Sequence, residues 1–231
     1  MPRKFERTIT LIGEENFQKL QKATVMLVGL GGVGGYAGEA LVRSGIGKLI
    51  VIDKDEVEAS NLNRQIIATE DTVGQQKVEV FAQRARSINP DVQIIKHAAF
   101  MNEDNLEEFF CEKVDFVIDA IDTLSSKVAL WKYCQENNIG IISCLGTAKK
   151  LDPTKLQITT LAKTDTDPMA KALRQIARRR EVDLHIPVVF SREEPINKSS
   201  EMLGSMMFVP ASAGILCASY VVRQLIDITN N

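Results

Sequence analysis

TVMLVGLGGVGG, the stretch from residue 24 to residue 35, decides the fold of this 231-residue chain. Its first five residues are mostly apolar and rich in β-branched side chains, which predicts a short strand buried in a parallel sheet. The glycines that follow fit the pattern G-x-G-x-x-G, and residues 33–44 carry apolar side chains at helical spacing. A glycine turn between a strand and a helix is the setting in which this pattern binds nucleotides.

Each glycine of the pattern suits a different task. Gly29 can make the tight turn, Gly31 leaves room for a phosphate beside the backbone, and Gly34 lets the helix pack closely on the strand. The start of the helix then offers unpaired N–H groups to an anion. Asp53 follows the next strand pattern, residues 48–52, where a ribose hydroxyl would bind. These features alone fit NAD and ATP equally well.

Outward from this unit, helical and strand patterns alternate along the chain. Helical patterns occupy residues 73–88, 105–110 and 124–136, and strand patterns occupy residues 92–95, 114–118 and 139–144. Such alternation predicts an α/β fold of the Rossmann-like kind, with a mostly parallel sheet and helices on both faces.

After residue 145 the alternation weakens, so we expect a decorated C-terminal third. It comprises a strand at 155–161, a basic helix at 168–180, a short strand at 188–190, a polar loop at 192–201 and an apolar helix at 202–222. We interpret residues 1–231 as one domain: an N-terminal arm or helix (1–23), a nucleotide-binding core (24–146) and a substrate-side extension with the C-terminal helix (147–231). The last helix lacks charges and could span a membrane by length, but its small residues and Pro210 favour a buried helix.

Composition narrows the class of protein. The net charge of -2 excludes wholesale nucleic-acid binding, so any such contact needs a local patch. A candidate patch is the basic stretch with Lys163, Lys171, Arg174, Arg178, Arg179 and Arg180, which Lys149 and Lys150 could extend. None of the four cysteines forms a CxxC pair, which excludes a zinc site of that type. The N-terminus has no secretory pattern, and we therefore expect a cytoplasmic protein.

Charged residues near the glycine turn favour ATP over NAD. Arg64 and Lys77 are two cations suited to a triphosphate, and Asp122 is a carboxylate suited to Mg²⁺. The carboxyl ends of parallel strands meet at the ligand crevice, so these side chains should converge there. NAD has a diphosphate and needs no metal, which leaves an NAD-dependent oxidoreductase as the weaker alternative.

Together these motifs resemble the ThiF/MoeB/HesA family, the prokaryotic relatives of ubiquitin-activating enzymes. The matching motifs are Gly29-x-Gly31-Gly32-Val33-Gly34, Asp53-x-Asp55, Ser60-Asn61-Leu62-x-Arg64-Gln65, Val73-Gly74-x-x-Lys77 and Asp119-x-x-Asp122. The resemblance implies that the glycines, Asp53 and Asp55 bind ATP, with Asp53 on the ribose. It further implies that Asn61, Arg64 and Lys77 contact phosphates and that Asp122 places Mg²⁺. It also implies a homodimer in which Arg7 reaches the partner's ATP.

Stretches beyond the core indicate the substrate. Asp152-Pro153-Thr154, Leu161-Ala162-Lys163-Thr164 and Asp167-Pro168 are most similar to family members that dehydrate threonylcarbamoyladenosine in tRNA. That resemblance implies adenylation of the threonyl carboxylate followed by ring closure, with catalysis by Arg64, Lys77, Arg7 and Asp122. The alternatives are an activator of a ubiquitin-like sulfur-carrier protein, with a sulfur-transfer partner, and a non-catalytic nucleotide-binding scaffold.

Some residues depart from the family or leave two interpretations open. The common Asp-Asn pair is Asp122-Thr123 here, and a glycine-rich stretch is replaced by residues 146–150. A thioester route would need a nucleophilic cysteine, for which only Cys144 is suitably placed, but we favour a buried apolar role for it. His97 ends a strand pattern and is expected to be structural.

Overall fold

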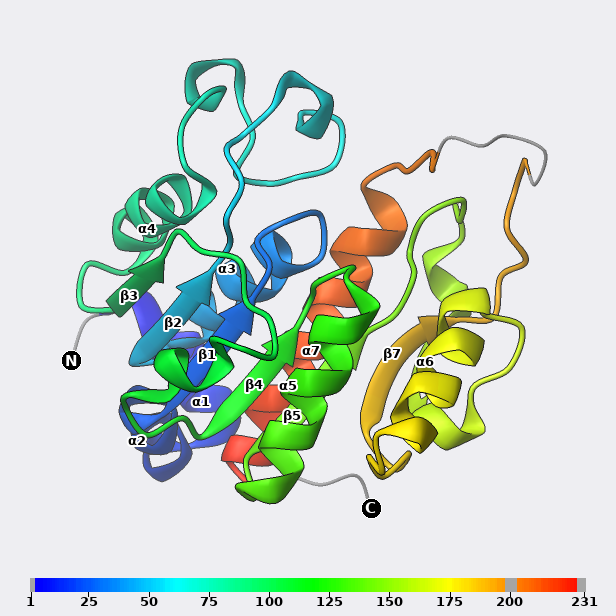
Figure 1. Cartoon of the computed structure of the whole chain (residues 1–231). Coiled ribbons are helices and arrows are strands. Elements are labelled where there is room, and N and C mark those ends of the chain that lie inside the picture. The colour runs from blue at the N-terminus through cyan, green and yellow to red at the C-terminus, as the bar shows by residue number, and fades with distance from the viewer. Residues whose placement is uncertain (1–2, 198–202, 228–231) are drawn as a thin grey trace.

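The computed structural model describes residues 3–197 and 203–227 and confirms the predicted α/β architecture (Figure 1). The helices are α1 (Glu6–Ile12), α2 (Glu14–Lys22), α3 (Gly34–Ser44), α4 (Lys77–Ile88), α5 (Leu124–Glu136), α6 (Pro168–Arg179) and α7 (Phe208–Leu225). The strands are β1 (Thr24–Val28), β2 (Lys48–Ile52), β3 (Gln93–His97), β4 (Phe116–Asp119), β5 (Gly140–Cys144), β6 (Leu156–Thr160) and β7 (Pro187–Ser191). Short 3₁₀ helices lie between several of them.

The strands form one sheet in the order β3-β2-β1-β4-β5-β7-β6. Every neighbouring pair is parallel except β6 and β7, so the decorated C-terminal third adds the antiparallel edge. Chain order reverses between β1 and β4, whose registers pair Val28 with Asp119. In open parallel sheets a crevice opens at the carboxyl ends of the strands at such a reversal. The topology therefore places a ligand site beyond residues 28 and 119.

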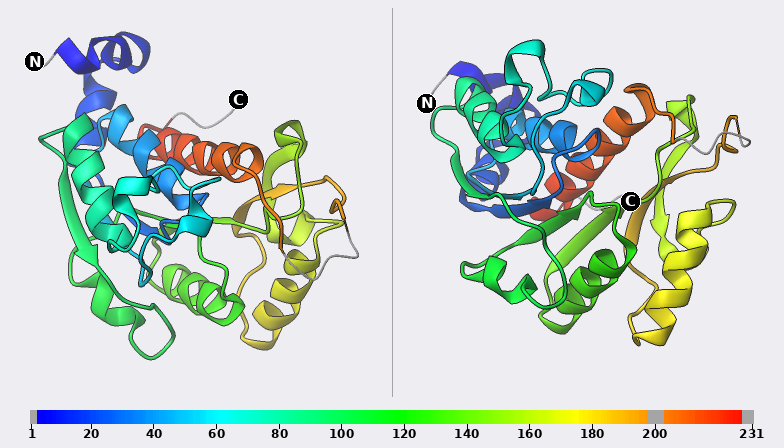
Figure 2. Two further views of the ribbon diagram at one scale, coloured as in Figure 1. Left: turned by 90° about the horizontal axis from the view of Figure 1, so that it is seen from above. Right: turned by 45° about the horizontal axis from the view of Figure 1, so that its top comes forward.

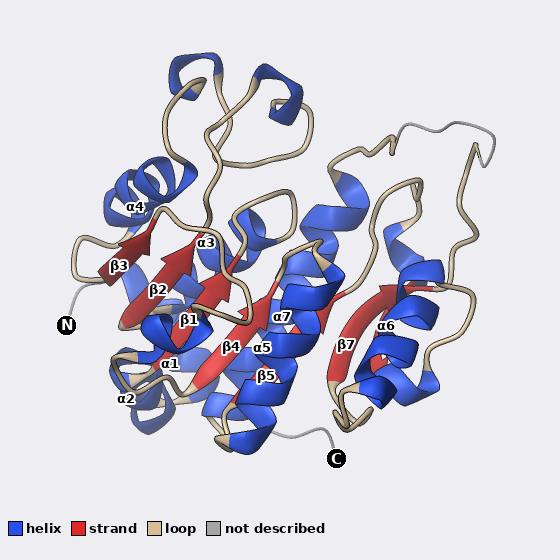
Figure 3. Ribbon diagram, viewed as in Figure 1, coloured by secondary structure: helices blue, strands red, loops and turns tan. Residues whose placement is uncertain are grey.

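Helices cover both faces of the sheet (Figure 3). One core cluster joins α3, α4 and α7 to the sheet and includes Leu41 and Val221. The other joins α5 and α6 to the opposite face and includes Trp131 and Leu173. All five residues of β1 are buried because both faces are covered, as its continuous apolar pattern predicts.

The apolar C-terminal helix packs inside the protein. Figure 2 shows α7 alongside α3, and Gly214 permits this approach because a Cβ there would lie 2.2 Å from the carbonyl oxygen of Val33. Within the described residues α7 alone is long and apolar enough to cross a membrane, but its buried face belongs to the core cluster. Helix α7 begins at Phe208 rather than at residue 202, which lies outside the described residues.

The helix predicted over residues 73–88 starts later than expected. Residues 73–76 form a turn, with Gly74 in the left-handed region at φ 84°, and α4 begins at Lys77. The amide of Lys77 donates to the carbonyl oxygen of Asp55 at 3.0 Å. The turn thus ties the start of α4 to the segment that follows β2, which brings Lys77 to the carboxyl end of the sheet.

Candidate functional site

A cleft of about 590 Å³ opens at the carboxyl ends of β1, β2, β4 and β5. It is lined by nine of the residues predicted to bind nucleotide: Gly29, Gly31, Gly32, Asp53, Asp55, Asn61, Arg64, Lys77 and Asp122. Residues that lie almost a hundred positions apart in the sequence are therefore brought to one wall, as the strand topology requires.

The glycine turn is built by close backbone contact. Gly29 has φ 92°, and a Cβ on it would lie 2.8 Å from the carbonyl oxygen of Ala120, so the turn abuts the segment after β4. Gly34 lies behind the cleft wall, where a Cβ would lie 1.8 Å from the carbonyl oxygen of Gly29. Its place agrees with the packing role expected for the third glycine. Gly31, Gly32 and Val33, which lead into α3, line the cleft, so an anion there would lie beside the start of this helix.

Asp53 is held against the glycine turn by its own carboxylate. Oδ2 accepts from the amide of Leu30 at 2.7 Å, and Oδ1 accepts from the amide of Asp55 at 2.8 Å. Each carboxylate oxygen has a second lone pair, so both can still accept from a ligand hydroxyl. The arrangement fixes the orientation of Asp53 before any nucleotide arrives.

The two predicted cations lie on separate elements of the cleft wall. Lys77 is buried at the start of α4, and its Nζ lies 3.1 Å from Oδ2 of Asp55. Arg64 Nη1 donates to the carbonyl oxygen of Ser60 at 2.8 Å and to Oδ1 of Asn63 at 3.0 Å. Both guanidinium and ammonium have further donors for phosphate oxygens.

Asn61 and Gln65 are buried polar residues in the loop that carries Arg64. Asn61 Oδ1 accepts from the amide of Glu58 at 3.1 Å, which closes the first turn of the 3₁₀ helix at Ala59–Asn61. Gln65 has no hydrogen-bond partner for its buried Oε1 among the described residues. The motif included Gln65 without giving it a role, and its unpaired oxygen together with its place in the cleft lining adds it to the candidate binding residues.

Asp119 and Asp122 have different environments. Asp122 is exposed in the cleft, whereas Asp119 is fully buried beneath it. Asp119 accepts from Lys127 Nζ, Trp131 Nε1 and Ser143 Oγ at 2.9, 2.9 and 2.6 Å. Sequence reasoning missed this network, because Lys127 looks like an ordinary helix charge and nothing in the sequence marks it as buried.

Cys144 lines the cleft but is only 4% exposed. Its Sγ lies 3.4 Å from the carbonyl oxygen of Leu145, and it also contacts Cys217, where a hydrogen bond with Cys144 and then burial raise the pKa of the Cys217 thiol. His97, also predicted to be structural, stacks edge-on against Phe109 with ring centroids 5.2 Å apart.

The segment that replaces the family's glycine-rich stretch divides between two roles. Residues 146–148 line the cleft. The expectation that Lys150 extends a surface patch is wrong, because Lys150 is buried and its Nζ lies 3.1 Å from Oδ2 of Asp167. The same ammonium donates to the carbonyl oxygens of Gly146 and Ser191 at 3.0 and 3.3 Å, so it braces the extension against the core.

The basic stretch is only partly a surface patch. Lys163, Lys171, Arg178 and Arg179 are exposed, on α6 and the 3₁₀ helix before it. Arg174 is half-buried and bonds to Thr164, and Arg180 pairs with Glu103 at 2.8 Å. The available cations are therefore fewer than the six that the sequence indicated.

Arg7 is exposed on α1 and does not line the cleft of its own chain. The preceding residues are tied to the loop before β3, where Lys4 Nζ bonds to Asn89 and Asp91 at 2.8 and 2.9 Å. That loop lies where β3 begins, at the opposite end of the sheet from the cleft. Any contact between Arg7 and a nucleotide therefore requires a second chain.

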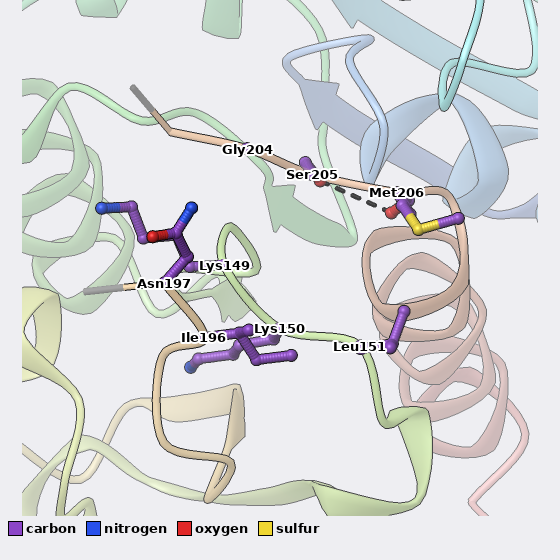
Figure 4. A pocket seen from close by; sticks show the side chains of 8 residues that line it. All are labelled: Lys149, Lys150, Leu151, Ile196, Asn197, Gly204, Ser205 and Met206. Carbon is purple, nitrogen blue, oxygen red and sulfur yellow. Dashed lines mark hydrogen bonds between the residues drawn. The ribbon is translucent and has the colours of Figure 1, made fainter. Parts of the chain in front are cut away.

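A smaller pocket of about 330 Å³ adjoins the cleft, and Ser205 lines both (Figure 4). Its other lining residues are Lys149, Lys150, Leu151, Ile196, Asn197, Gly204 and Met206. The amide of Lys149 donates to the carbonyl oxygen of Gly204 at 2.8 Å, and the amide of Ile196 donates to that of Lys149 at 2.7 Å. The C-terminal extension thus continues the wall of the cleft.

Comparison with known proteins reveals relatives that match almost the whole chain. Residues 5–231 match the sequence description of the ThiF family. The tRNA threonylcarbamoyladenosine dehydratase of Bacillus subtilis (strain 168) is 39% identical, over 98% of this chain and 96% of that protein. The crystal structures of E. coli tRNA N6-threonylcarbamoyladenosine dehydratase, TcdA, with AMP and with ATP superpose with TM-scores of 0.93 and 0.92, at 37% and 36% identity. Each covers 97% of this chain and 94% of the E. coli chain.

Proposed function

This chain belongs to the ThiF family, and on that premise we propose that it is an ATP-dependent dehydratase of threonylcarbamoyladenosine in tRNA. The observation that carries the proposal is the convergence of the glycine turn, Asp53, Arg64, Lys77 and Asp122 on one cleft. The similarity to relatives of that name extends through the C-terminal extension, where substrate choice would be set.

In the proposed reaction a threonyl carboxylate oxygen attacks the α-phosphorus of ATP, and the bond to pyrophosphate breaks. The carbamoyl group then attacks the acyl carbon, AMP leaves, and a proton is released as the ring closes. The nucleoside loses one water in total. The nucleophile is already ionised, so this step needs no general base.

Arg64 and Lys77 would stabilise the charge that builds on the phosphate oxygens during attack. Both are anchored before ATP binds, Arg64 by Ser60 and Lys77 by Asp55, so little reorganisation is needed. Asp53 would accept from the ribose, and the amides at the start of α3 would bind phosphate oxygens. Arg7 of a second chain would complete the site in a homodimer.

The residues present fit Mg²⁺ held jointly with ATP. Asp122 is an exposed carboxylate in the cleft, and the described residues contain no group of three acidic, histidine or cysteine side chains that could hold an ion without help. Mg²⁺ is commonly bound by one or two carboxylates plus substrate phosphates. Asp122 would hold it, and the ion would supply positive charge that neutralises the phosphates.

The tRNA would lie along α6. Met169, in the first turn of α6, lines the cleft, and the helix runs from there for about 18 Å at its ordinary rise per residue. The exposed cations Lys163, Lys171, Arg178 and Arg179 lie along or beside it and would contact the phosphate backbone. We place the reaction in the cytoplasm, where tRNA is found.

The test is mass spectrometry of nucleosides from tRNA that carries threonylcarbamoyladenosine, after incubation with the protein, ATP and Mg²⁺. A nucleoside lighter by one water, formed only with ATP, is the expected result. An unchanged nucleoside with intact ATP binding would contradict the proposal and favour activation of a carrier protein's C-terminus. A Lys77→Ala preparation serves as the matched control for contaminating activity.

A further inference from the structure

Lys127 is a fully buried lysine that no step of the proposed chemistry uses. Its side chain and that of its partner Asp119 are both 0% exposed, and Nζ lies 2.9 Å from Oδ1. A buried ion pair contributes little net stability, because desolvation offsets the attraction between the charges. Its presence directly beneath the cleft therefore calls for another explanation, which its remaining hydrogen bonds provide.

The second bond of Lys127 is to the cleft wall. Its Nζ donates to the carbonyl oxygen of Ile121 at 2.9 Å, while the amide of Ile121 donates to Oδ1 of Asp119 at 3.3 Å. Both polar backbone groups of Ile121 are thus held by the same ion pair. Since Ile121 directly precedes Asp122, the ion pair controls the backbone on which the exposed carboxylate stands.

Peptide geometry extends this control to a hydrogen-bond donor. The peptide between Ile121 and Asp122 is trans, so its N–H points opposite to its C=O. The carbonyl points inward to Lys127, and the amide of Asp122 therefore points away from the core. Within the described part of the chain, that amide has no hydrogen-bond partner. Lys127 thereby orients both a carboxylate and a free N–H at the cleft wall.

The network also joins this wall to the rest of the site. Asp119 binds Ser143 of β5 and Trp131 of α5, and the carbonyl oxygen of Ala120 abuts Gly29. A change at Lys127 can therefore move Asp122 relative to the glycine turn. Lys127 itself does not line the cleft, so it would act through the backbone of Ile121.

We propose that Lys127 is a positioning residue that holds the Ile121–Asp122 peptide so that Asp122 presents its carboxylate and amide to Mg²⁺ and the phosphates of bound ATP. The proposal rests on the proposed function for its effect on adenylation, but its effect on nucleotide binding can be measured separately. A residue that holds a metal ligand in place typically contributes about 10- to 100-fold to metal affinity.

The experiment compares the affinity for ATP with Mg²⁺ and with EDTA by titration calorimetry. Lys127→Met alone leaves a buried unpaired charge and can fail to fold, so the informative variant is Lys127→Met with Asp119→Asn. We expect the preference for Mg-bound over metal-free ATP to fall by at least about tenfold in this variant. Lys127→Arg, which keeps the charge and donors, is expected to recover part of it.

Ser143→Ala is the matched control, because it removes a bond to the other oxygen of Asp119 and leaves Lys127 and Ile121 paired. It is expected to lower the melting temperature while keeping the preference for Mg-bound ATP. Trp131 is the single tryptophan of the chain and bonds to Asp119, so its emission reports whether the network persists.

A folded double variant with the wild-type preference would overturn the proposal, as would an equal loss in Ser143→Ala. If the wild-type protein binds Mg-bound ATP with a preference but produces no lighter nucleoside, the proposed function fails while the inference about Lys127 still stands. The two failures are therefore distinguishable.

Discussion

The ammonium of Lys77 lies 3.1 Å from the carboxylate of Asp55, although 22 positions separate them in the sequence. The lysine side chain is 7% exposed and the aspartate side chain is 53% exposed, so the pair links a buried cation to an open carboxylate at the cleft. Asp55 thus holds the ammonium at the wall while its other donors stay available to a phosphate. This geometry prepares Lys77 for charge stabilisation.

Lys77→Ala is expected to abolish adenylation without unfolding the chain. Removal of a prearranged charge-stabilising donor typically costs about 100-fold or more in turnover, and here the cation is also lost. ATP–pyrophosphate exchange measures the activity, and circular dichroism measures the melting temperature. Lys96→Ala, which breaks the exposed pair with Glu79 on the same helix, is the control and should keep full exchange. Normal exchange by the Lys77 variant would exclude its phosphate role.

Much of the nucleotide cleft follows from the sequence because its determinants are local. The glycine turn needs a strand before it and a helix after it, and both were predicted within a residue of their observed bounds. Parallel topology then forces Asp53 and Asp122 to the same end of the sheet, whatever lies between them. Strand burial and strand order could therefore be predicted without knowing the conformations of the loops.

The features that could not be predicted from the sequence depend on contacts between residues distant in the chain. Gly74 interrupts a pattern that otherwise continues the helix, and its left-handed turn is stabilised by contact with the segment after β2. Lysine is usually a surface residue, but Lys150 is buried here, where Asp167 neutralises its charge. The Asp119–Lys127 pair likewise forms between separate elements, so neither residue reveals its partner.

Cys144→Ser is expected to leave product formation largely intact. The thiol is buried, and a serine hydroxyl can still donate to the carbonyl oxygen of Leu145 that the thiol approaches. Nucleoside mass spectrometry gives the product, and pyrophosphate exchange gives the adenylation step. Complete loss of product with intact exchange would instead indicate a thioester intermediate. Cys134→Ser, at a buried position of α5 that does not line the cleft, controls for a loss of packing alone.

Glu39 is expected to make folding stability depend on pH. Burial alone would raise the pKa of Glu39, but hydrogen bonds from Arg84 and Arg43 outweigh it and hold the pKa below its usual value. A lowered folded pKa means that the stabilisation is complete above the unfolded pKa and is lost as the pH falls through the folded pKa.

At neutral pH, Glu39→Gln should therefore cost about 1–3 kcal/mol, since it weakens two charge-assisted hydrogen bonds, one from Arg43 within α3 and one from Arg84 of α4. Urea unfolding at pH 7 and at pH 3 measures the effect, and the difference from wild type should shrink at pH 3. An equal difference at both pH values would rule out the carboxylate as its source. Glu15→Gln, at an exposed position of α2, is the control.

Charge reversal along α6 is expected to weaken tRNA binding and to make that binding less dependent on salt concentration. Each lost phosphate contact should reduce the slope of log affinity against log salt by about one. Lys171→Glu and Arg178→Glu are the test variants, and Lys22→Glu on the distant α2 has the same charge change. Filter binding over a salt series measures the slopes. Equal slopes in all three variants would indicate that tRNA binds to a face of the protein other than α6.

Arg7 provides a test of the shared site that does not depend on seeing the dimer. Because Arg7 is exposed and lies outside its own cleft, Arg7→Ala should lose adenylation only if the residue acts on a partner. A mixture of Arg7→Ala and Lys77→Ala chains should then regain activity, since one of the two clefts in each mixed dimer has an intact Lys77 and receives an intact Arg7. Random exchange of equal amounts predicts about a quarter of the wild-type rate.

Recovery is measured by pyrophosphate exchange after co-refolding, with differently tagged chains to verify that mixed dimers form. Mixed dimers without any recovery would show that the two residues do not share a cleft, and full activity of Arg7→Ala alone would show that the cleft is complete within one chain.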